Sequence, residues 1–482
     1  MPNPSIHSGL KLDEVLPAPL DHVSGVTHST ALVQRKRLRL VPQTAATANP
    51  GDIINFLIQD PGFLDLQSAV FHANIVVTPG VAGVCTMDDG PSWCRQAVIQ
   101  VDGQNVETQD RVNKLTNMET YMTCSKSLYD RALSFAGYWK YSSDIGAAAA
   151  NLAPGSQGYW CDVSGNATAA SALYQTTTYG WDIAVPMGLL SHFFRQDRLF
   201  PSRFANNLLI QLQLEAAVAA LFSVGAGGGA SSTYQLTNIY LNVDSVTLNP
   251  AFTAFLQDQV SMPDGAGITL PTCTKISAQG QAQNNNGENT FVTSRASKNL
   301  KRIAIVQQPT AALGASATTY PEMSTFPSAG FNTRGQSGAV QGQFQLYIAG
   351  QYYPLFPARG SDAFWISHQA YNGHPLTDTD GGIVNYRTWG TTTQVSAAGT
   401  ANTGSAAWSD SCILAYDLSK MVGSSYALES DGVDSTGNAQ IQITIKTGPK
   451  ENGQAAESYT PLVEMLGTKY IVIANGELTV MG

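Results

Sequence analysis

The sequence is poor in charged residues. Asp, Glu, Lys and Arg make up 13% of its 482 residues, about half of the usual quarter. Acidic side chains outnumber basic ones by 35 to 26, so the formal net charge is −9. A protein that binds nucleic acid through phosphate contacts usually has the opposite balance. The composition therefore argues against extensive nucleic-acid binding by the body of the protein.

Cysteine is also scarce, and its spacing fits neither a disulfide framework nor a zinc site. The six cysteines are scattered between Cys85 and Cys412, with no CxxC pair, and the seven histidines form no HExxH motif. Disulfide frameworks belong to short secreted chains. We therefore expect free thiols in a reducing compartment, no bound metal and no cofactor.

Long apolar runs are missing as well. The longest, such as Ala216 to Phe222, fall well short of the roughly 20 residues that span a membrane. The first ten residues lack a charged region leading into an apolar block, so no signal peptide and no membrane span are expected. The hydrophobic fraction of 43% is nevertheless sufficient for sizeable cores. A chain of this length predicts two or three domains.

Alternation of apolar and polar residues predicts a protein built mainly from β-strands. In the segment 69–77 every second residue is apolar and inward-facing, which is typical of a half-buried strand. Asp102-Gly103 lies between two alternating runs and predicts a hairpin, because both central residues of a type I′ turn need positive φ. Further strands are predicted within 51–60, 234–248, 297–308 and 344–357, with a closing hairpin turned at Asn475-Gly476.

Short helices and long loops separate these strands. Apolar residues at three- and four-residue spacings predict a helix within 111–136. Pro250 opens another helix, and a helix-like stretch covers 362–379. The Gly- and Ser-rich segments 137–180 and 381–408 read as long surface loops.

Two stretches have the same order of elements. Residues 186–214 predict a short apolar helix, a polar excursion and a strand, and residues 413–447 predict the same series. Ile441 in the second strand follows Ile210 in the first by 231 residues. A hairpin at Ala349-Gly350 likewise follows the one at Asp102-Gly103. These landmarks predict that one β-unit occurs twice in the chain.

Each half contains about eight predicted strands, which is enough to form one β-sandwich. The spacing of the predicted strands does not distinguish a jelly roll from other β-sandwiches. The helix predicted just before a late strand in each half favours the jelly roll. We predict an all-β fold of two consecutive eight-stranded antiparallel jelly-roll sandwiches with short helices and long surface loops. The predicted parts are an N-terminal arm (1–48), a first jelly roll (49–265) and a second jelly roll (266–482).

One dense group of positive charge stands out near the N-terminus. Its members are Arg35, Lys36, Arg37 and Arg39. As part of an arm facing the interior of an assembly, they would contact an acidic partner or, weakly, a genome. Alternatively, this segment is a first strand with Leu38 and Leu40 on one face and solvated basic side chains on the other.

Six segments, taken in order, resemble those of a known family. They are GFLDLQSAVFHANIVV (62–77), IQVDGQNVETQDRVNKL (99–115), VPMGLLSHFFRQDRLFPSRFANNLLIQLQLE (185–215), SKNLKRIAIVQQ (297–308), FQLYIAGQYYPLFP (344–357) and DLSKMVGSSYALESDGVDSTGNAQIQITI (417–445). The family is the double jelly-roll major capsid proteins, which include adenovirus hexon and those of giant DNA viruses, virophages and polinton-like viruses. The polinton-like members are similar in size.

This resemblance implies a structural protein of the virion and no catalytic activity. It implies a homotrimer that forms a pseudo-hexagonal capsomer, and capsomers that tile an icosahedral shell around a DNA genome. Neighbouring trimers, penton proteins and minor capsid proteins would be its partners.

Contacts between subunits are then the functional sites that we expect. The candidates are the arginines of the polar excursion, Arg195, Arg198 and Arg203, and the aromatic residues Tyr352, Tyr353 and Phe356. Phe364 and Trp365 belong to the same aromatic group. Large aromatic side chains are common interface anchors, but these could equally form the ordinary core of a sandwich.

Two other functions fit a β-sandwich. A glycan- or receptor-binding protein would use exposed aromatic residues of the 137–180 loop. A glycan-active enzyme would need two carboxylates at a defined separation across a cleft. The candidate carboxylates are Asp88, Asp89, Asp362, Asp378 and Asp380. No GxSxG, HExxH or P-loop motif supports an enzyme.

Overall fold

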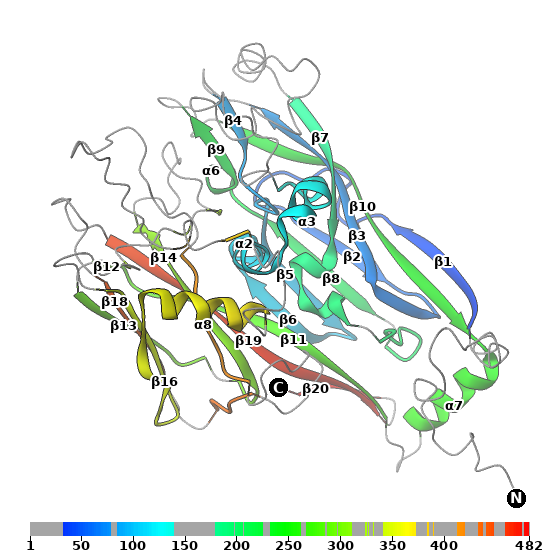
Figure 1. Ribbon diagram of the computed structural model, residues 1–482. Helices are drawn as coiled ribbons and strands as arrows, with labels where there is room; N and C mark the ends of the chain where they lie inside the picture. The colour runs from blue at the N-terminus through cyan, green and yellow to red at the C-terminus, as the bar shows by residue number, and fades with distance from the viewer. Residues whose placement is uncertain are drawn as a thin grey trace, which may run out of the picture.

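The computed structural model shows two β-sandwiches side by side, with a helix between them (Figure 1). The residues that the structure describes are 32–78, 84–138, 179–196, 198–205, 207–224, 232–261, 267–284, 287–295, 297–310, 323–324, 326, 331, 341–372, 383–384, 389, 412–419, 432–436, 440–447, 458–474 and 477–481.

The first sandwich consists of two facing four-stranded sheets with the orders β1-β10-β3-β7 and β2-β8-β5-β6. All of these pairs are antiparallel. The strands are β1 (Leu32–Leu40), β2 (Ile53–Ile58), β3 (Phe63–Thr78), β5 (Cys94–Val101), β6 (Gln104–Asp110), β7 (Tyr179–Pro186), β8 (Leu208–Leu214) and β10 (Thr233–Leu248). The first of these eight strands pairs with the last, and the second with the seventh, which is the connectivity of a jelly roll. A small additional sheet pairs β4 (Val84–Met87) with β9 (Leu221–Val224).

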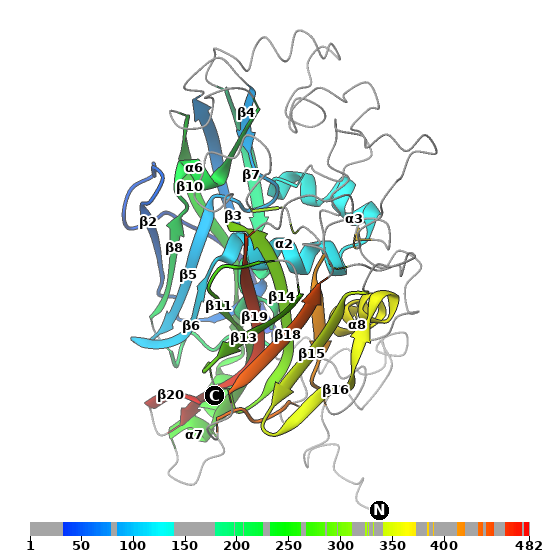
Figure 2. The ribbon, with the colours of Figure 1, turned by 90° about the vertical axis from the view of Figure 1, so that its left-hand side faces the viewer.

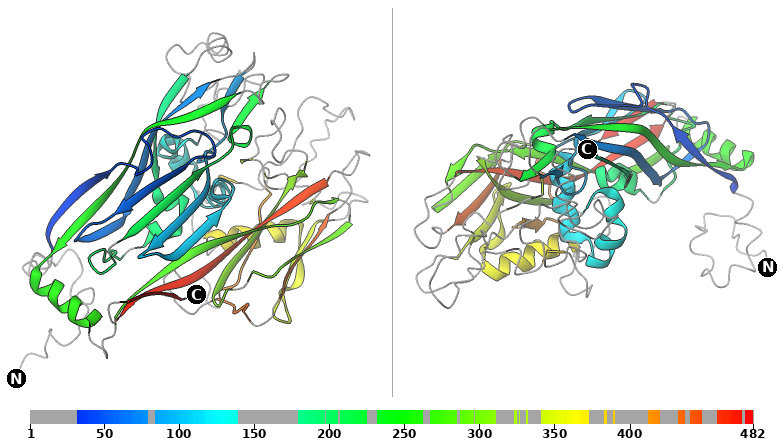
Figure 3. Two further views of the ribbon diagram at one scale, coloured as in Figure 1. Left: turned by 180° about the vertical axis from the view of Figure 1, so that it is seen from behind. Right: turned by 90° about the horizontal axis from the view of Figure 1, so that it is seen from above.

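The second sandwich repeats this connectivity, with the orders β11-β19-β14-β17 and β13-β18-β15-β16. Its strands are β11 (Ile268–Gln279), β13 (Gly287–Thr293), β14 (Leu300–Pro309), β15 (Gln343–Ile348), β16 (Gln351–Arg359), β17 (Leu414–Asp417), β18 (Ile441–Thr447) and β19 (Ser458–Ala474). Two short strands, β12 (Gln283–Asn284) and β20 (Glu477–Met481), extend the first of these sheets by pairing with β19. The predicted fold of two consecutive antiparallel jelly rolls is confirmed, and Figure 3 shows the two rolls from behind and from above. The domain limits themselves stay a prediction.

The repeated landmarks occupy equivalent positions in the two rolls. β8 and β18 are each the seventh strand of their roll, and both bury every second residue. The hairpins β5–β6 and β15–β16 join the fourth and fifth strands of their rolls. Their turns at Asp102-Gly103 and Ala349-Gly350 have positive φ at both central residues, as a type I′ turn requires.

The helix predicted at the start of the second repeat is wrong. Residues 414–417 form strand β17, which pairs with β14, and the neighbouring Ile413 is fully buried. A short apolar run that is buried on both faces cannot be told from a helix by its periodicity. In the first repeat the helix is present as α5 (Met187–Leu190), followed by the 3-10 turn η5 (His192–Arg195).

The predicted N-terminal arm is wrong for residues 32–40, because they form β1 at the edge of a sheet. β1 pairs with β10 from Leu32 opposite Leu248 to Leu40 opposite Leu241. Leu38 and Leu40 pack against the core, and the four basic side chains of this strand are exposed. The alternative interpretation, a first strand with one solvated face, therefore describes this segment. Residues 1–31 lie outside the described part of the chain.

Helix α2 (Val112–Thr123) lies between the two rolls (Figure 2). The helix predicted within 111–136 is confirmed but divided: Cys124 is extended, and the Ser125 hydroxyl caps the next helix, α3 (Lys126–Arg131), before the 3-10 turn η3 (Leu133–Ala136). Residues 112–122 are all buried, polar ones included. A helix that is buried on every side must find partners for its polar side chains within the protein.

The remaining helices are α6 (Ala217–Ala220), α7 (Pro250–Ser261) and α8 (Gly360–Asn372). α7 begins at Pro250 as predicted and connects β10 to β11. α8 confirms the described part of the helix-like stretch 362–379. Among the described helices, none is long and apolar enough to cross a membrane. The predicted loops 137–180 and 381–408 lie almost entirely outside the described residues.

Candidate functional sites

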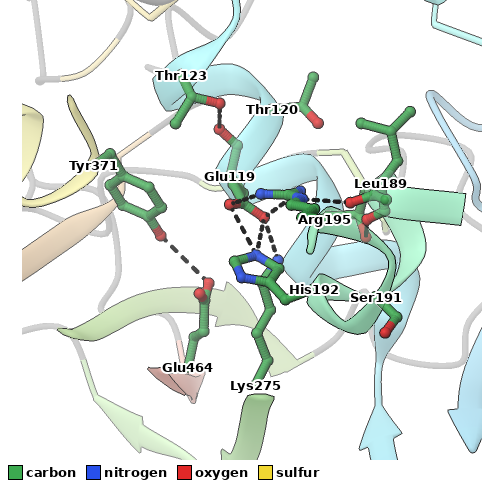
Figure 4. A network of polar contacts seen from close by, with 12 residues as sticks. Glu119, Thr120, Thr123, Leu189, Ser191, His192, Arg195, Lys275, Tyr371 and Glu464 are labelled. Atoms are coloured by element: carbon green, nitrogen blue, oxygen red, sulfur yellow. Dashed lines mark hydrogen bonds and ion pairs between the residues drawn. The ribbon is translucent and has the colours of Figure 1, made fainter. Parts of the chain in front are cut away.

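A buried group of charged residues joins the two rolls, and we call it the junction cluster. Its centre is Glu119 on α2, whose side chain is 3% exposed. His192 and Arg195 reach it from η5 of the first roll, and Lys275 reaches it from β11 of the second roll (Figure 4). The Glu119 carboxylate is therefore shared between side chains of both rolls.

The contacts within the junction cluster are short and numerous. His192 Nε2 lies 3.0 Å from both carboxylate oxygens of Glu119. Arg195 forms a two-pronged pair, with Nη1 at 2.6 Å and Nη2 at 3.1 Å. Lys275 Nζ donates to Oε2. A carboxylate has about four lone-pair sites, so Glu119 is saturated and offers no position to a substrate or metal.

The surrounding charges fix the protonation of the cluster. Burial would raise the pKa of Glu119, but Arg195, His192 and Lys275 together hold this pKa well below its ordinary value. Burial, followed by the charge of Arg195, lowers the pKa of His192 to about 3. At neutral pH Glu119 is thus a carboxylate, and His192 is neutral and donates its Nε2–H to it.

Stability should fall as the pH drops from about 6.5 toward 3. The unfolded chain takes up a proton at His192 near its ordinary pKa of 6.5, whereas the folded chain does so only near 3. Within this window each pH unit costs up to about 1.4 kcal/mol for this one group. Glu119 acts in the same direction below its ordinary value of 4.5, since only the unfolded carboxyl is then protonated.

The variant His192→Gln isolates this effect, because glutamine keeps an N–H donor toward Glu119 but does not titrate. Urea unfolding of both proteins between pH 7 and 4.5 should show a steeper loss of stability in the wild type. The other histidines are common to both proteins and cancel in the comparison. Parallel pH profiles would show that the protonation of His192 is not linked to folding.

Further polar contacts connect α2 to the second roll. Lys114 Nζ donates to Gln308 Oε1 at 2.7 Å, and Asn117 Nδ2 donates to the carbonyl of Met323 at 3.1 Å. The Tyr121 carbonyl accepts from the backbone N–H groups of residues 383 and 384. The buried polar side chains of α2 therefore find several of their partners in the other roll.

Of the candidate carboxylates for an enzyme, Asp88 and Asp89 accept hydrogen bonds from neighbouring protein groups, and Asp362 lies on helix α8. Asp88 accepts from the backbone N–H of Met323 at 2.6 Å and from the Ser324 hydroxyl at 2.5 Å. Asp89 accepts from the hydroxyls of Tyr121 and Tyr129. Asp362 is exposed in the first turn of α8. Asp378 and Asp380 lie outside the described residues, as does nearly all of the loop 137–180 on which a glycan-binding function would depend.

The basic residues of β1 contact acidic and aromatic side chains of their own roll. Arg35 Nη2 lies 2.8 Å from a carboxylate oxygen of Asp65 and of Asp244. Lys36 lies 3.3 Å from Asp60, Arg37 lies 3.8 Å from Asp244, and the Arg39 guanidinium lies 3.7 Å from the ring centre of Tyr240. The exposed positive surface that remains for an outside partner is smaller than the sequence implies.

The three arginines proposed as subunit contacts have different surroundings. Arg195 belongs to the junction cluster, although a third of its side chain is exposed. Arg198 donates from Nη1 to the Thr269 carbonyl at 3.3 Å, which again joins the first roll to the second. Arg203 is exposed, and its backbone N–H donates to Gly62. A contact of these arginines with another subunit stays a prediction.

The aromatic group divides between surface and core. On β16, which is an edge strand, Tyr352 is 54% and Phe356 78% exposed. Tyr353 is half-buried near Tyr416, and Phe364 is buried against Trp389. The core interpretation is therefore correct for Phe364 and wrong for Tyr352 and Phe356. A contact of Tyr352 and Phe356 with another subunit stays a prediction.

Sequence patterns did not predict the junction cluster. Its partners come from residues 119, 192, 195 and 275, and only the packing of the two rolls brings Lys275 to Glu119. One signal was available: Lys114 and Glu119 occur in a helix whose apolar residues surround them on several faces. Charged residues in such a helix indicate buried ion pairs or hydrogen bonds.

Solved structures share this architecture over nearly the whole chain. The Faustovirus major capsid protein matches with a TM-score of 0.56 and 11% identity, over 92% of this chain and 91% of that one. The mavirus major capsid protein matches with a TM-score of 0.51 and 11% identity, over 98% and 96%. A chain of the Sputnik virophage structure matches with a TM-score of 0.56 and 12% identity, over 93% and 88%.

This is the double jelly-roll fold of viral major capsid proteins. The predicted resemblance is confirmed at the level of the fold, over nearly the whole chain. No protein-family model matches the sequence, and no curated protein does. The junction cluster joins the two rolls. Strand β16 lies at an outer edge of the second roll (Figure 2).

Proposed function

We propose that the protein is a viral major capsid protein, located in the virion, whose copies form trimeric pseudo-hexagonal capsomers that tile an icosahedral shell around DNA. The observation that carries this proposal is the pair of complete jelly rolls in one chain, matched from end to end by capsid proteins. Three copies would place six similar rolls around one axis. That arrangement gives a trimer a nearly hexagonal outline.

The junction cluster supports a structural role. A closed shell requires subunits that meet in fixed directions, so the two rolls of one subunit must keep one relative orientation. Buried, multiply hydrogen-bonded ion pairs hold a specific geometry, since any shift leaves a charge without a partner. We assign Glu119 and Lys275 to this task, and no catalytic activity is proposed for them.

The proposed partners are other copies of the chain first, then penton and minor capsid proteins. The outer face of β1 could add a weak contact to the genome through Arg37 and Arg39, whose side chains remain exposed. Such a contact would be weak because acidic neighbours compensate part of this charge.

The oligomeric state tests the proposal directly. We expect purified protein to sediment as a trimer of three times 51.2 kDa, and negative-stain images at higher concentration to show hexagonal sheets or closed particles. Light scattering would check the mass independently of shape. A chain that stays monomeric at every concentration, or that turns over a glycan, would contradict the capsid function.

A further inference from the structure

We infer that a rigid apolar knob on β16 makes the principal contact between copies of this chain within the trimer. This inference rests on the proposed capsid function and adds the surface and the type of contact. The knob consists of residues 354–357, with Leu355 and Phe356 at its tip.

The knob is a bulge in the edge strand. β15 and β16 pair at Phe344 with Ala358 and at Leu346 with Tyr353, so residues 354–357 stand opposite the single residue Gln345. The Gln345 amide donates to the carbonyl of Pro354 at 3.1 Å and to that of Leu355 at 3.2 Å. Both contacts attach the bulge to the sheet and hold it in one conformation.

The tip of the knob is apolar and exposed. Phe356 is 78% exposed and Leu355 72%. Tyr352, earlier on the same strand, is 54% exposed, and Trp365, on the helix α8 that follows it, is 48% exposed. A large aromatic side chain buries about 150–250 Å², so covering these four would remove on the order of 400 Å² from water. A standard interface buries roughly 800 Å² per partner. The knob with Tyr352 and Trp365 could therefore supply about half of one. The largest apolar patch on a monomer, about 300–600 Å², is often functional.

The edge of β16 is unsuited to pairing with another strand. Pro354 and Pro357 have no N–H to donate, and the bulge interrupts the ladder between them. Prolines and bulges are devices that block edge-to-edge pairing. A partner must therefore accept the knob through side-chain packing in a pocket, the kind of site in which interface hot spots occur.

The position of the knob favours a second copy of the chain as its partner. In the sheet β13-β18-β15-β16, the β13 edge faces the first roll across a groove that Arg111 and Val292 both line. β16 is the opposite edge and points away from the first roll of its own chain (Figure 2). A knob that enters a different surface of the next copy is a heterologous contact, and such contacts close into rings when the rotation permits.

The double variant Leu355→Ser with Phe356→Ser tests the knob. Both side chains are exposed in the single chain, so the variant should fold with unchanged circular dichroism. At concentrations at which both proteins are monomeric, its thermal unfolding should also match that of the wild type. In sedimentation velocity over a range of concentrations, its trimer should dissociate at concentrations about a hundredfold or more above those of the wild type. The matched control is Phe252→Ser with Phe255→Ser, which changes two exposed phenylalanines of α7 (42% and 56%) and should leave the trimer unchanged.

A second readout does not depend on loss of assembly. In Phe356→Trp, the emission in excess of that from the seven native tryptophans, taken as the difference from the wild type, should move to shorter wavelength when monomers associate. A double variant that forms trimers as readily as the wild type would contradict the role of the knob in the trimer but not the capsid function. A wild-type chain that never leaves the monomeric state would overturn the capsid function and the knob together.

Discussion

Replacing Glu119 by alanine should destabilise the protein by about 3–5 kcal/mol, the range measured when one partner of a buried ion pair is removed. The physical reason is the charge that remains. Lys275 is 1% exposed and contacts the carboxylate directly, so its ammonium group would lose its anionic partner in a dry environment. Chemical denaturation followed by tryptophan fluorescence measures this loss.

A double substitution separates two contributions to this destabilisation: the lost attraction between Glu119 and Lys275, and the cost of leaving Lys275 buried without its partner. Glu119→Leu combined with Lys275→Met removes both charges and should be more stable than either single variant, because apolar replacements of a buried pair are often tolerated. Glu288→Gln on β13 serves as the control, since this carboxylate is exposed and should change stability by less than about 1 kcal/mol. If Glu119→Ala stays within about 1 kcal/mol of the wild type, the junction cluster does not hold the rolls together.

Deleting residues 1–45 should abolish folding of the first roll. β1 supplies the edge of the sheet along β10, and Leu38 and Leu40 cover part of the core. Without β1, β10 loses its antiparallel partner from Leu241 to Leu248 and becomes an exposed edge, which favours aggregation. We expect the truncated chain to be recovered as aggregate, without the cooperative thermal transition of the full chain.

Neutralising the outer face of the same strand is the matched control. Arg35→Gln with Arg37→Gln leaves β1 in place and removes exposed ion pairs, each worth roughly 0–1 kcal/mol. This variant should fold and unfold cooperatively. A soluble, cooperatively unfolding protein that lacks residues 1–45 would show that β1 is dispensable for the fold.

The sequence predicts those parts of the fold in which one face of a strand is buried. In β3 the alternation of Phe71, Ala73 and Ile75 with more polar neighbours reports the burial directly. Turns with positive φ, such as Asp102-Gly103, are equally local, because their residue preference comes from the backbone. Together these signals predict two antiparallel β-units. The prediction that these units are jelly rolls depends also on the helix before a late strand and on the family resemblance.

Features that depend on the packing of distant segments could not be predicted in this way. β17 has only four residues with no alternation, and it is a strand because β14 lies beside it. The segment 1–48 is predicted to be an arm because it is rich in Pro, Ser, Thr and His and has little periodicity before residue 31. The pairing of β1 with β10 and its ion pairs with Asp65 and Asp244 depend on other strands. The exposure of Phe356 depends on the bulge opposite Gln345, which has no signature in composition or periodicity.

The contacts of helix α2 determine whether the two rolls can be treated as separate units. By sequence it belongs to the first roll, yet Lys114, Asn117 and Glu119 find partners in the second. Either roll expressed alone would lose these contacts, and the first roll would expose to water the side of α2 that the second roll covers. The two rolls repeat one connectivity, but they are not interchangeable modules, because α2 forms contacts with both.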